Sequence, residues 1–437
     1  MNYIKAQEFI YEKNKMGIVQ GTSHIKDLLG MLGNPQDQVK CLHIAGTNGK
    51  GSVFTFVENV LIKAGYRVGR YVSPTIFNYL ERFRINQVDM PEHIFAKLID
   101  KVKSYEEELV KNGQNPLTAF EVETVVAFLY FAQEKVDFAL IECGMGGRLD
   151  ATNVITMPVC SVISTISMDH MSYLGNSLLE ITDNKSAIIR PNGACIYGIQ
   201  EKSVQDRITE HCKSINAYCI GVNRSDIKDK SISLDGTIFS YEGESYRLSM
   251  LGDVQADNAA LAVKILHYLM EKGVADKLTE QNIKEGLLCA DWPGRLTKVH
   301  ENPIVLVDGA HNEDAWLRLA ESINKYFTNQ RIIFIIGVLK DKAYDRLADI
   351  LCPYMYHAIL ITPDSPRALK KEELSEVIKK RGVPCETALE VTDAYDKAFA
   401  VAQGFDSDNC AILVCGSLSF LKDYLLYDFD KKEADRR

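Results

Sequence analysis

The chain has 437 residues, which is too long for one ordinary hydrophobic core, so two domains are expected. Hydrophobic residues make up 46% and charged residues 25%, the balance of a soluble globular protein. A net charge of -9 argues against a nucleic-acid partner, and no apolar run of about 18 residues could span a membrane. The first residues mix charged with apolar side chains and contain no signal-peptide core, so a cytoplasmic location is expected.

The chain contains eleven cysteines, and no two of them form a CxxC pair. Several lie inside apolar, strand-like runs, namely Cys41, Cys160, Cys410 and Cys415. We expect them to be small buried hydrophobic residues in a reducing compartment. The spacing does not favour a zinc site or a disulfide framework.

Strand-like and helix-like runs alternate through the first half of the chain. The expected helices cover residues 53–64, 92–112 and 120–134, and the expected strands cover residues 41–45, 136–142, 159–166 and 194–198. Such alternation is typical of βαβ units around a mainly parallel sheet. The sequence therefore predicts an α/β domain.

A small hairpin is expected within residues 231–249, followed by a helix over residues 255–272. The dipeptide Pro293-Gly294 interrupts regular structure, and the alternation then restarts. The expected later strands cover residues 304–307, 331–336, 358–361 and 411–414. We therefore predict a larger α/β domain with a mainly parallel sheet over residues 1–296 and a smaller, Rossmann-like α/β domain over residues 297–437.

The strongest local signal is the segment LHIAGTNGKGS at residues 42–52, where a glycine-rich turn joins a strand to a helix. Glycines let successive N–H groups face one anion, and the helix N-terminus adds partial positive charge. Lys50 can reach the terminal phosphates of ATP, and Ser52 can ligate Mg²⁺. The pattern GxxxxGK(S/T) is not fully met, because Gly51 separates these two residues, and a turn without a ligand is the alternative. The predicted phosphate-binding residues are Gly46, Thr47, Asn48, Gly49, Lys50, Gly51 and Ser52.

Three further polar residues follow apolar, strand-like runs. Glu142 lies where VDFALIE enters GMGGR, Asp308 ends the run IVLVD, and His170 follows the run at residues 159–166. Ligands gather at the carboxyl ends of such strands, and carboxylates suit a hard cation. The structural alternatives are a capping or ion-pairing role for Glu142 and a hydrogen-bonded core position for His170.

Further segments occur in a fixed order along the chain. They are YVSP at 71–74, ERFRI at 81–85, TAFE at 118–121, ECGMGGRLDATN at 142–153, SMDH at 167–170, WPGR at 292–295, DGAHN at 308–312 and GSL at 416–418. Together with GTNGKGS, they resemble motifs of the folylpolyglutamate synthase/dihydrofolate synthase family of the Mur ligase superfamily. One coincident motif would be weak, but an ordered series across most of the chain is specific.

The resemblance implies a monomeric, ATP- and Mg²⁺-dependent ligase that adds L-glutamate to folates, and to dihydropteroate, through an acyl phosphate. It leaves an additional monovalent cation open. It implies Mg²⁺ ligation by Ser73, Glu142 and His170, in addition to Ser52. The residues with implied catalytic roles are Lys50, Glu142, His170 and Lys185.

The family carries a lysine at the position of Lys185 that is carbamylated by CO₂. The reaction requires a neutral amine, so the lysine pKa must be lowered from its usual value of about 10.4. Here NKSAI at 184–188 stands where the family usually has EKAGI. This departure keeps an ordinary salt-bridged lysine as the alternative.

The resemblance also implies contacts with both substrates. Nucleotide contacts are implied for Asn258, Arg295, Asp308 and His311. Contacts with the pterin or pteroate group are implied for Thr118, Ala119, Phe120, Glu121, Leu149, Asp150 and Ala151. Arg82 could supply positive charge for glutamate carboxylates. Thr118 and Glu121 also fit a helix capping box, which is the structural alternative.

Two other functions would share part of this motif pattern. A cell-wall Mur ligase acting on a UDP-sugar peptide carries a UDP-binding domain ahead of the phosphate loop, and 45 residues are too few for it. A non-catalytic nucleotide-binding switch would need a guanine-reading NKxD, whereas NKSA at 184–187 lacks the acid. A degenerate, inactive member of the family is supported only by the altered flank of Lys185.

Overall fold

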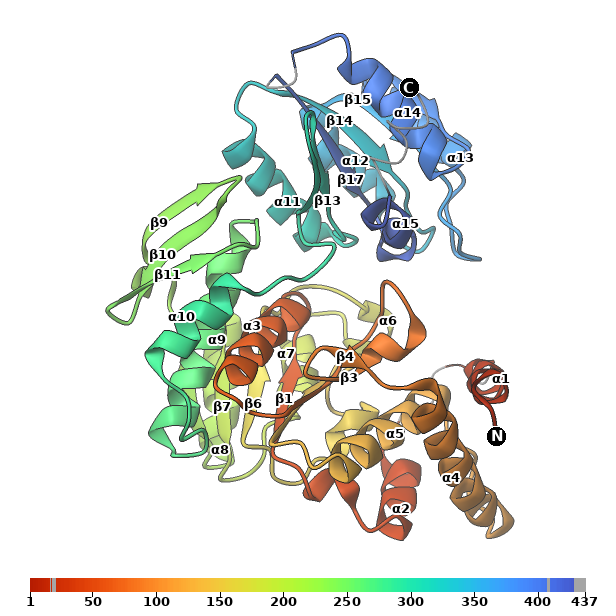
Figure 1. The fold of residues 1–437 in the computed structure, drawn as a ribbon, viewed down its shortest axis with the longest axis vertical. Coiled ribbons are helices and arrows are strands. Elements are labelled where there is room, and N and C mark those ends of the chain that lie inside the picture. The colour runs from red at the N-terminus through yellow and green to blue at the C-terminus, as the bar shows by residue number, and fades with distance from the viewer. Residues whose placement is uncertain (16, 18–20, 407–408, 428–437) are drawn as a thin grey trace. The chain divides into compact units, whose positions relative to one another are not determined.

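The computed structural model describes residues 1–15, 17, 21–406 and 409–427 (Figure 1). The chain divides into two compact units. Unit 1 comprises Met1–Ile227 and Asp257–Cys289, and unit 2 comprises Lys228–Ala256 and the described part of Ala290–Arg437. This division differs from the predicted boundary after residue 296, because residues 228–256 and 290–296 group with the C-terminal part of the chain.

Unit 1 is built on an eight-stranded sheet of order β4-β3-β2-β5-β1-β6-β7-β8. Its strands are β1 (Cys41–Ala45), β2 (Val68–Tyr71), β3 (Phe83–Ile85), β4 (Val88–Asp89), β5 (Phe138–Glu142), β6 (Cys160–Ile163), β7 (Ala194–Tyr197) and β8 (Tyr218–Gly221). The run from β2 to β8 is parallel, and β3 and β4 add antiparallel pairs at one edge. The prediction of a mainly parallel α/β sheet is confirmed.

The helices of unit 1 cover its sheet and extend from one edge (Figure 1). They are α1 (Tyr3–Asn14), α2 (Ser23–Met31), α3 (Lys50–Lys63), α4 (Glu92–Lys111), α5 (Ala119–Gln133), α6 (Met171–Leu174), α7 (Leu178–Ser186), α8 (Lys202–Ser214), α9 (Val254–Glu271) and α10 (Glu280–Leu288). Helix α3 begins at Lys50 rather than at residue 53, because Gly49 takes a left-handed conformation (φ 85°) and the helix starts directly after it.

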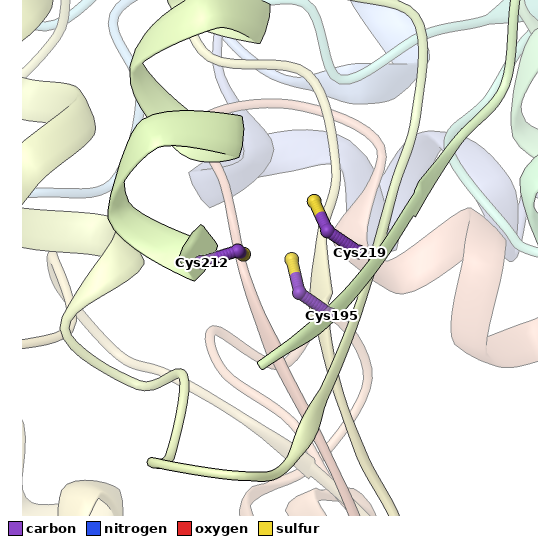
Figure 2. A group of neighbouring side chains, drawn as sticks. All are labelled: Cys195, Cys212 and Cys219. Carbon is purple, nitrogen blue, oxygen red and sulfur yellow. The ribbon is translucent and has the colours of Figure 1, made fainter. Parts of the chain in front are cut away.

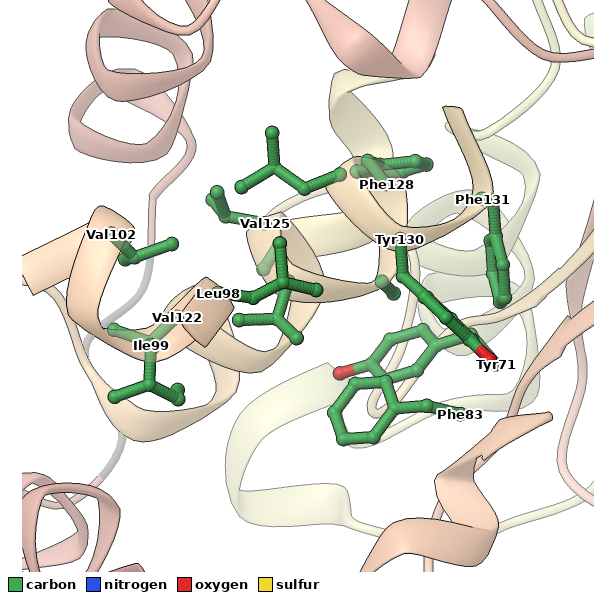
Figure 3. Packing of buried hydrophobic residues seen from close by; sticks show 14 of the residues in the cluster. Tyr71, Phe83, Leu98, Ile99, Val102, Val122, Val125, Phe128, Tyr130 and Phe131 are labelled. Atoms are coloured by element: carbon green, nitrogen blue, oxygen red, sulfur yellow. The ribbon is translucent and has the colours of Figure 1, made fainter. Parts of the chain in front are cut away.

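One part of the unit 1 core lies between α4, α5 and the sheet (Figure 3). Helix α5 is buried on nearly all sides, so it carries no polar face that periodicity could reveal. Tyr71 of β2 stacks on Phe83 of β3, with ring centroids 5.5 Å apart. Burying each such aromatic side chain contributes about 1.5–3 kcal/mol, so this packing fixes the strand that leads to Ser73.

Unit 2 begins in sequence with a three-stranded antiparallel sheet rather than the predicted hairpin. Its strands are β9 (Lys228–Ser233), β10 (Gly236–Tyr241) and β11 (Glu244–Leu248). The first strand was missed because KDKSIS is mostly polar and exposed. Asp253, just beyond this sheet, forms an ion pair with Lys325, and the Gly252 N–H donates to the Tyr326 hydroxyl at 2.7 Å. These contacts link residues 228–256 to the C-terminal part of the chain.

The main sheet of unit 2 has the order β12-β13-β17-β14-β15-β16. Its strands are β12 (Thr297–Glu301), β13 (Ile304–Val307), β14 (Arg331–Ile336), β15 (Met355–Leu360), β16 (Cys385–Thr387) and β17 (Cys410–Cys415). Its helices are α11 (Glu313–Tyr326), α12 (Tyr344–Leu351), α13 (Lys371–Lys379), α14 (Val391–Ala402) and α15 (Leu421–Leu425). All strands except β12 are parallel, which confirms the predicted second α/β sheet.

Two properties expected from composition can be checked directly. Among the helices that the structure describes, none combines the length and hydropathy needed to cross a membrane. The four cysteines named from their apolar runs are all buried, as predicted: Cys41, Cys160, Cys410 and Cys415.

Candidate functional site

Four adjacent parallel strands of unit 1, in the order β2-β5-β1-β6, end at one edge of the sheet. Ser73 follows β2, Glu142 is the last residue of β5, and the turn at residues 46–49 follows β1. The loop that leads to His170 follows β6. The strand order therefore gathers the residues predicted for phosphate and Mg²⁺ at the edge where α/β sheets bind ligands.

The turn after β1 depends on two glycines with positive φ. A Cβ atom on Gly46 (φ 156°) would lie 1.8 Å from the Ser164 hydroxyl oxygen, and one on Gly49 would lie 2.5 Å from Asn258 Oδ1. The Thr47 N–H donates to the Thr165 carbonyl at 2.8 Å, which fixes the turn against the loop after β6. The turn then delivers the N-terminus of α3, whose first amides and partial positive charge favour an anion.

Lys50 and Glu142 form an ion pair at the centre of this edge. The Lys50 ammonium lies 3.6 Å from Glu142 Oε1, and it donates to the carbonyls of Gly46 and Thr47 at 3.2 and 3.3 Å. Glu142 is 6% exposed, so the pair is only weakly screened by water. Lys50 thus lies folded back over the turn, where a phosphate could replace the carbonyls as its partner.

Lys185, on α7, reaches the same turn from another side. Its ammonium donates to the Gly46 carbonyl at 2.8 Å, and the residue is 4% exposed. Burial, and then the positive charge of Lys50, lowers its pKa to about 7. A substantial fraction of this amine is therefore neutral near physiological pH, which is unusual for lysine.

The remaining predicted metal ligands differ in their surroundings. Ser73 is partly exposed at the end of β2. Ser52 is 2% exposed in the first turn of α3. His170 is half exposed, has φ 48°, and its Nε2 lies 3.8 Å from Asp169 Oδ2. The structure brings these residues to one edge of the sheet, and their role as ligands stays a prediction.

A pocket of about 400 Å³ opens beside Ser73 in unit 1. Its described lining residues are Asn14, Gly17, Gly21, Ser73, Thr118, Ala119, Phe120, Glu121, Gly144, Met145, Leu149, Asp150, Ala151, Leu174 and Asn184. The lining thus includes both segments predicted to contact a pteroate group, 118–121 and 149–151. Its apolar wall with a few polar groups suits a flat, partly polar ring system.

Two wall residues also hold helix α5 in place. Thr118 and Glu121 form the capping box that the sequence left open: the Glu121 N–H donates to Thr118 Oγ1 at 3.3 Å, and the Thr118 N–H donates to Glu121 Oε2 at 2.8 Å. Between them, the ring of Phe120 stacks on Tyr71 at a centroid distance of 6.0 Å. The side chain of Glu121 is therefore engaged in fixing the helix start.

Asp150 is likewise held by its own loop. One carboxylate oxygen accepts the Met145 N–H at 2.8 Å, and the other accepts the Thr152 N–H at 3.0 Å and the Thr152 hydroxyl at 2.6 Å. Burial nevertheless raises the pKa of this carboxyl. Asp150 therefore shapes the turn that forms one wall of the pocket.

Asn184 is a wall residue that was not predicted as a site residue. Its Oδ1 accepts the N–H of Gly147 at 3.1 Å, and a Cβ atom on Gly146 would lie 2.5 Å from that oxygen. Its only signal in the sequence was the departure from EKAGI beside Lys185. Asn14, Gly17 and Gly21 were also missed, because nothing local predicts that the N-terminal segment reaches the pocket.

Arg82 does not line this pocket. It forms an ion pair with Glu123 of α5, and its guanidinium lies 4.5 Å from the ring centroid of Tyr79. The side chain is 15% exposed, so it is largely occupied within the fold. The predicted role of Arg82 in binding glutamate carboxylates stays a prediction.

The predicted nucleotide residues of unit 2 cluster after β13. Asp308 Oδ1 accepts the Ala310 N–H at 2.8 Å, and its Oδ2 accepts the Leu296 N–H at 2.9 Å. Burial raises the pKa of this carboxyl, while the neighbouring Arg295 charge opposes the shift. His311 Nδ1 lies 2.8 Å from the Gly309 carbonyl. Asn258 belongs to unit 1, where its Oδ1 would lie 2.5 Å from a Cβ atom on Gly49.

Comparisons with known proteins agree with this arrangement. A family model for the Mur ligase middle domain matches residues 44–266, and one for the Mur ligase glutamate ligase domain matches residues 294–418. The chain is 32% identical over 437 residues to the dihydrofolate synthase/folylpolyglutamate synthase of Bacillus subtilis, a match that covers 96% of this chain and 98% of that protein. It is 31% identical over 426 residues to the folylpolyglutamate synthase of Lacticaseibacillus casei, covering 96% of each.

Solved structures resemble the whole chain as well. The Mycobacterium tuberculosis folylpolyglutamate synthase complexed with ADP and AMPPCP has a TM-score of 0.86 and 27% identity, covering 98% of this chain and 100% of that chain. Escherichia coli FolC in complex with DHPP and ADP has a TM-score of 0.83 and 26% identity, covering 99% and 98%. With both domain matches and 32% identity over nearly the full length, the chain belongs to the folylpolyglutamate synthase/dihydrofolate synthase family of Mur ligases.

Proposed function

We propose that this protein is an ATP-dependent ligase that adds L-glutamate to reduced folates and to dihydropteroate. The observation that carries the proposal is the edge formed by β2, β5, β1 and β6, where a phosphate-type loop with Lys50 adjoins a pocket of about 400 Å³. Relatives named as both dihydrofolate synthase and folylpolyglutamate synthase support the two acceptors. The solved relatives with ADP, AMPPCP and DHPP support nucleotide and acceptor binding.

The reaction needs activation, because a carboxylate does not condense with an amine at neutral pH. In the proposed route, an acceptor carboxylate oxygen attacks the γ-phosphorus of ATP, the bond from that phosphorus to the bridging oxygen breaks, and ADP leaves. The amino nitrogen of glutamate then attacks the acyl carbon, loses a proton, and displaces phosphate. Lys50 and the amides at the start of α3 stabilise the charge on the transferring phosphoryl group.

Mg²⁺ binding is proposed for Glu142, Ser73 and His170, with Ser52 beside the phosphates. The donor set fits, because a carboxylate and hydroxyl oxygens are ligands that a hard cation accepts. The buried carboxylate of Glu142 ends β5 and lies 3.6 Å from the Lys50 ammonium, which supports a cation beside the proposed phosphate position. When bound, the cation neutralises phosphate charge.

Lys185 is proposed as a carbamylated residue. The lone pair of its neutral amine attacks the carbon of CO₂, and loss of one proton leaves a carbamate with a single negative charge. Burial and a pKa lowered to about 7 supply the neutral amine. The change also replaces a repulsion from Lys50 with an attraction. It offers one more anionic oxygen ligand at the sheet edge where β2, β5, β1 and β6 end, here called the phosphate edge.

The pocket lining supports a pteroate-type acceptor. The ring of Phe120 and the apolar Leu149 and Ala151 offer flat contact area, and the polar groups of Thr118 and Asp150 lie nearby. A pterin ring combines such a flat surface with several hydrogen-bonding edges. We therefore assign this pocket to the acceptor rather than to ATP, whose phosphates belong at the turn after β1.

An ADP-release assay with ATP, Mg²⁺ and L-glutamate tests the proposal. Dihydropteroate, tetrahydrofolate and a UDP-muramyl peptide acceptor are compared, and product mass is measured in parallel. We expect ADP release to require glutamate and either pteroate-type acceptor, with each product heavier by one glutamate residue. Release with the UDP-linked acceptor alone, or glutamate-independent GTP turnover, would refute the proposed function.

A further inference from the structure

Three cysteines meet on one face of the unit 1 sheet, away from the edge described above. Cys195 of β7 and Cys219 of β8 are direct partners in the parallel register, so their side chains leave the same face of the sheet. Cys212 of α8 points toward them from the helix that packs there (Figure 2). The three sulfur atoms lie within 4.8 Å of one another.

We propose that Cys195, Cys212 and Cys219 form a three-thiolate site for a thiophilic divalent cation of the Zn²⁺ class. Tetrahedral zinc has Zn–S bonds of about 2.3 Å, which places its sulfur ligands about 3.8 Å apart. The three sulfur atoms lie within 4.8 Å of one another, about 1 Å beyond that value at most. Thiolates select soft cations over Mg²⁺, so this site is chemically distinct from the oxygen ligands at the phosphate edge.

The surroundings allow a cation to enter and complete its coordination. Cys195 and Cys212 are buried, whereas Cys219 lies half-buried on the edge strand β8. Because Cys219 is partly exposed, water would be the fourth ligand. Three thiolates and a divalent cation carry one net negative charge, and the nearby Lys213 interacts favourably with Cys219.

The location assigns the cation a structural role. Cys195 and Cys219 are each the second residue of their strand, so the site lies toward the amino ends of strands whose carboxyl ends face the other way. A bound cation would tie helix α8 to β7 and to the short edge strand β8. Such a link stabilises the folded state, because the unfolded chain does not hold the three thiols together.

Cobalt substitution in the full chain tests this site. The tag-free protein is reduced, stripped of metal with a chelator and titrated with Co²⁺, and then with Zn²⁺. We expect thiolate-to-cobalt charge-transfer absorption that saturates at one Co²⁺ per chain, loss of that absorption on addition of Zn²⁺, and a higher thermal midpoint with Zn²⁺. Cys219→Ala should lose the absorption, whereas Cys289→Ala, at an exposed cysteine outside the group, should keep it.

A second measurement needs no variant and so does not depend on a substituted chain folding. Bound Zn²⁺ should slow the modification of these three thiols by an alkylating reagent, located by peptide mass, and leave Cys289 unaffected. Absence of the absorption in the unaltered protein, or its persistence in Cys219→Ala, overturns the proposal. A mass lower by two hydrogens without metal uptake would assign a disulfide instead. Ligase activity is measured separately, because Glu142 and His170 cannot produce a thiolate band.

Discussion

The two units each carry an acid where a parallel strand ends, yet the two acids are used differently. Both carboxylate oxygens of Asp308, after β13, accept backbone N–H groups, from Leu296 and Ala310. Glu142, at the end of β5, instead faces the ammonium of Lys50 at 3.6 Å. The strand-end position alone therefore does not distinguish the two acids, whereas the partner of each carboxylate does.

Backbone amides are fixed partners, whereas a lysine side chain can turn toward a phosphate. Replacing the backbone bonds of Asp308 would require its turn to rearrange. Replacing the contact between Lys50 and Glu142 requires only rotation about side-chain bonds. We therefore expect substitutions at the unit 1 edge to impair turnover mainly, and substitutions at the unit 2 turn to impair stability mainly.

The largest effect is expected for Lys50→Ala and Glu142→Ala. Lys50→Ala removes the positive charge proposed to stabilise the transferring phosphoryl group, and Glu142→Ala removes a proposed Mg²⁺ ligand beside it. Losses of electrostatic stabilisation of this type reduce turnover by roughly 10²–10³-fold. ADP formation with saturating substrates measures the loss, and circular dichroism checks the fold. Lys63→Ala is the matched control, because Lys63 is an exposed residue in the last turn of the same helix. Full turnover by Lys50→Ala would contradict the catalytic role expected for the unit 1 edge.

The next largest effect is expected in the pH dependence of stability, to which Lys185 contributes. Its pKa is about 7 in the folded protein and near 10.5 when unperturbed, so the unfolded state binds more protons between these values. The contribution of Lys185 to stability therefore rises as the pH increases from about 7 to about 10.5, by up to about 1.4 kcal/mol per pH unit. In CO₂-free buffer, Lys185→Met should flatten this part of the profile of thermal midpoint against pH.

Exposed Lys202 on α8 supplies the control for this measurement, and Lys202→Met should leave the profile unchanged. Adding bicarbonate should raise the activity of the unaltered protein and not that of Lys185→Met. A profile that keeps its slope in Lys185→Met would mean that another buried group causes it. A bicarbonate response that survives the substitution would exclude the proposed carbamate.

A smaller effect, mainly on stability, is expected for Asp308→Asn in the unit 2 turn. A carboxamide offers one acceptor oxygen, so the N–H of Leu296 or of Ala310 loses its partner, at a cost of about 1–3 kcal/mol. The thermal midpoint should fall while turnover falls less than in Glu142→Ala. An unchanged midpoint with a strongly raised KM for ATP would instead make Asp308 a nucleotide contact, as its motif predicts.

The alternation of strands and helices was sufficient to predict two α/β sheets, but not every strand that positions the site. Strand β2, which leads to Ser73, was missed because VGRY contains Arg70. That arginine is 2% exposed and forms a 2.7 Å ion pair with the buried Glu58. A charge buried through a partner on another element cannot be recognised from hydrophobic periodicity.

The pocket shows a similar limit. Its segments 118–121 and 149–151 were predicted through family resemblance, whereas spacing alone would have left Thr118 and Glu121 as a helix cap. The ion pair of Arg82 with Glu123 joins residues 41 positions apart, and the register of β7 and β8 brings two cysteines together without a CxxC motif. Such groupings follow from the packing of elements, which local patterns do not specify.

The smallest effect is expected for Thr118→Ala, which tests whether Thr118 binds the acceptor as well as capping its helix. Thr118 caps α5 and lines the pocket, whereas Thr279 forms an equivalent capping box at α10 and is not among the described lining residues. Losing a threonine cap costs about 1 kcal/mol, so Thr118→Ala and Thr279→Ala should lower stability to a similar degree. Only Thr118→Ala should raise KM for dihydropteroate. If both variants bind the acceptor equally well, Thr118 acts only as a helix cap. The residues expected to affect turnover would then be those around Lys50 and Glu142 at the sheet edge.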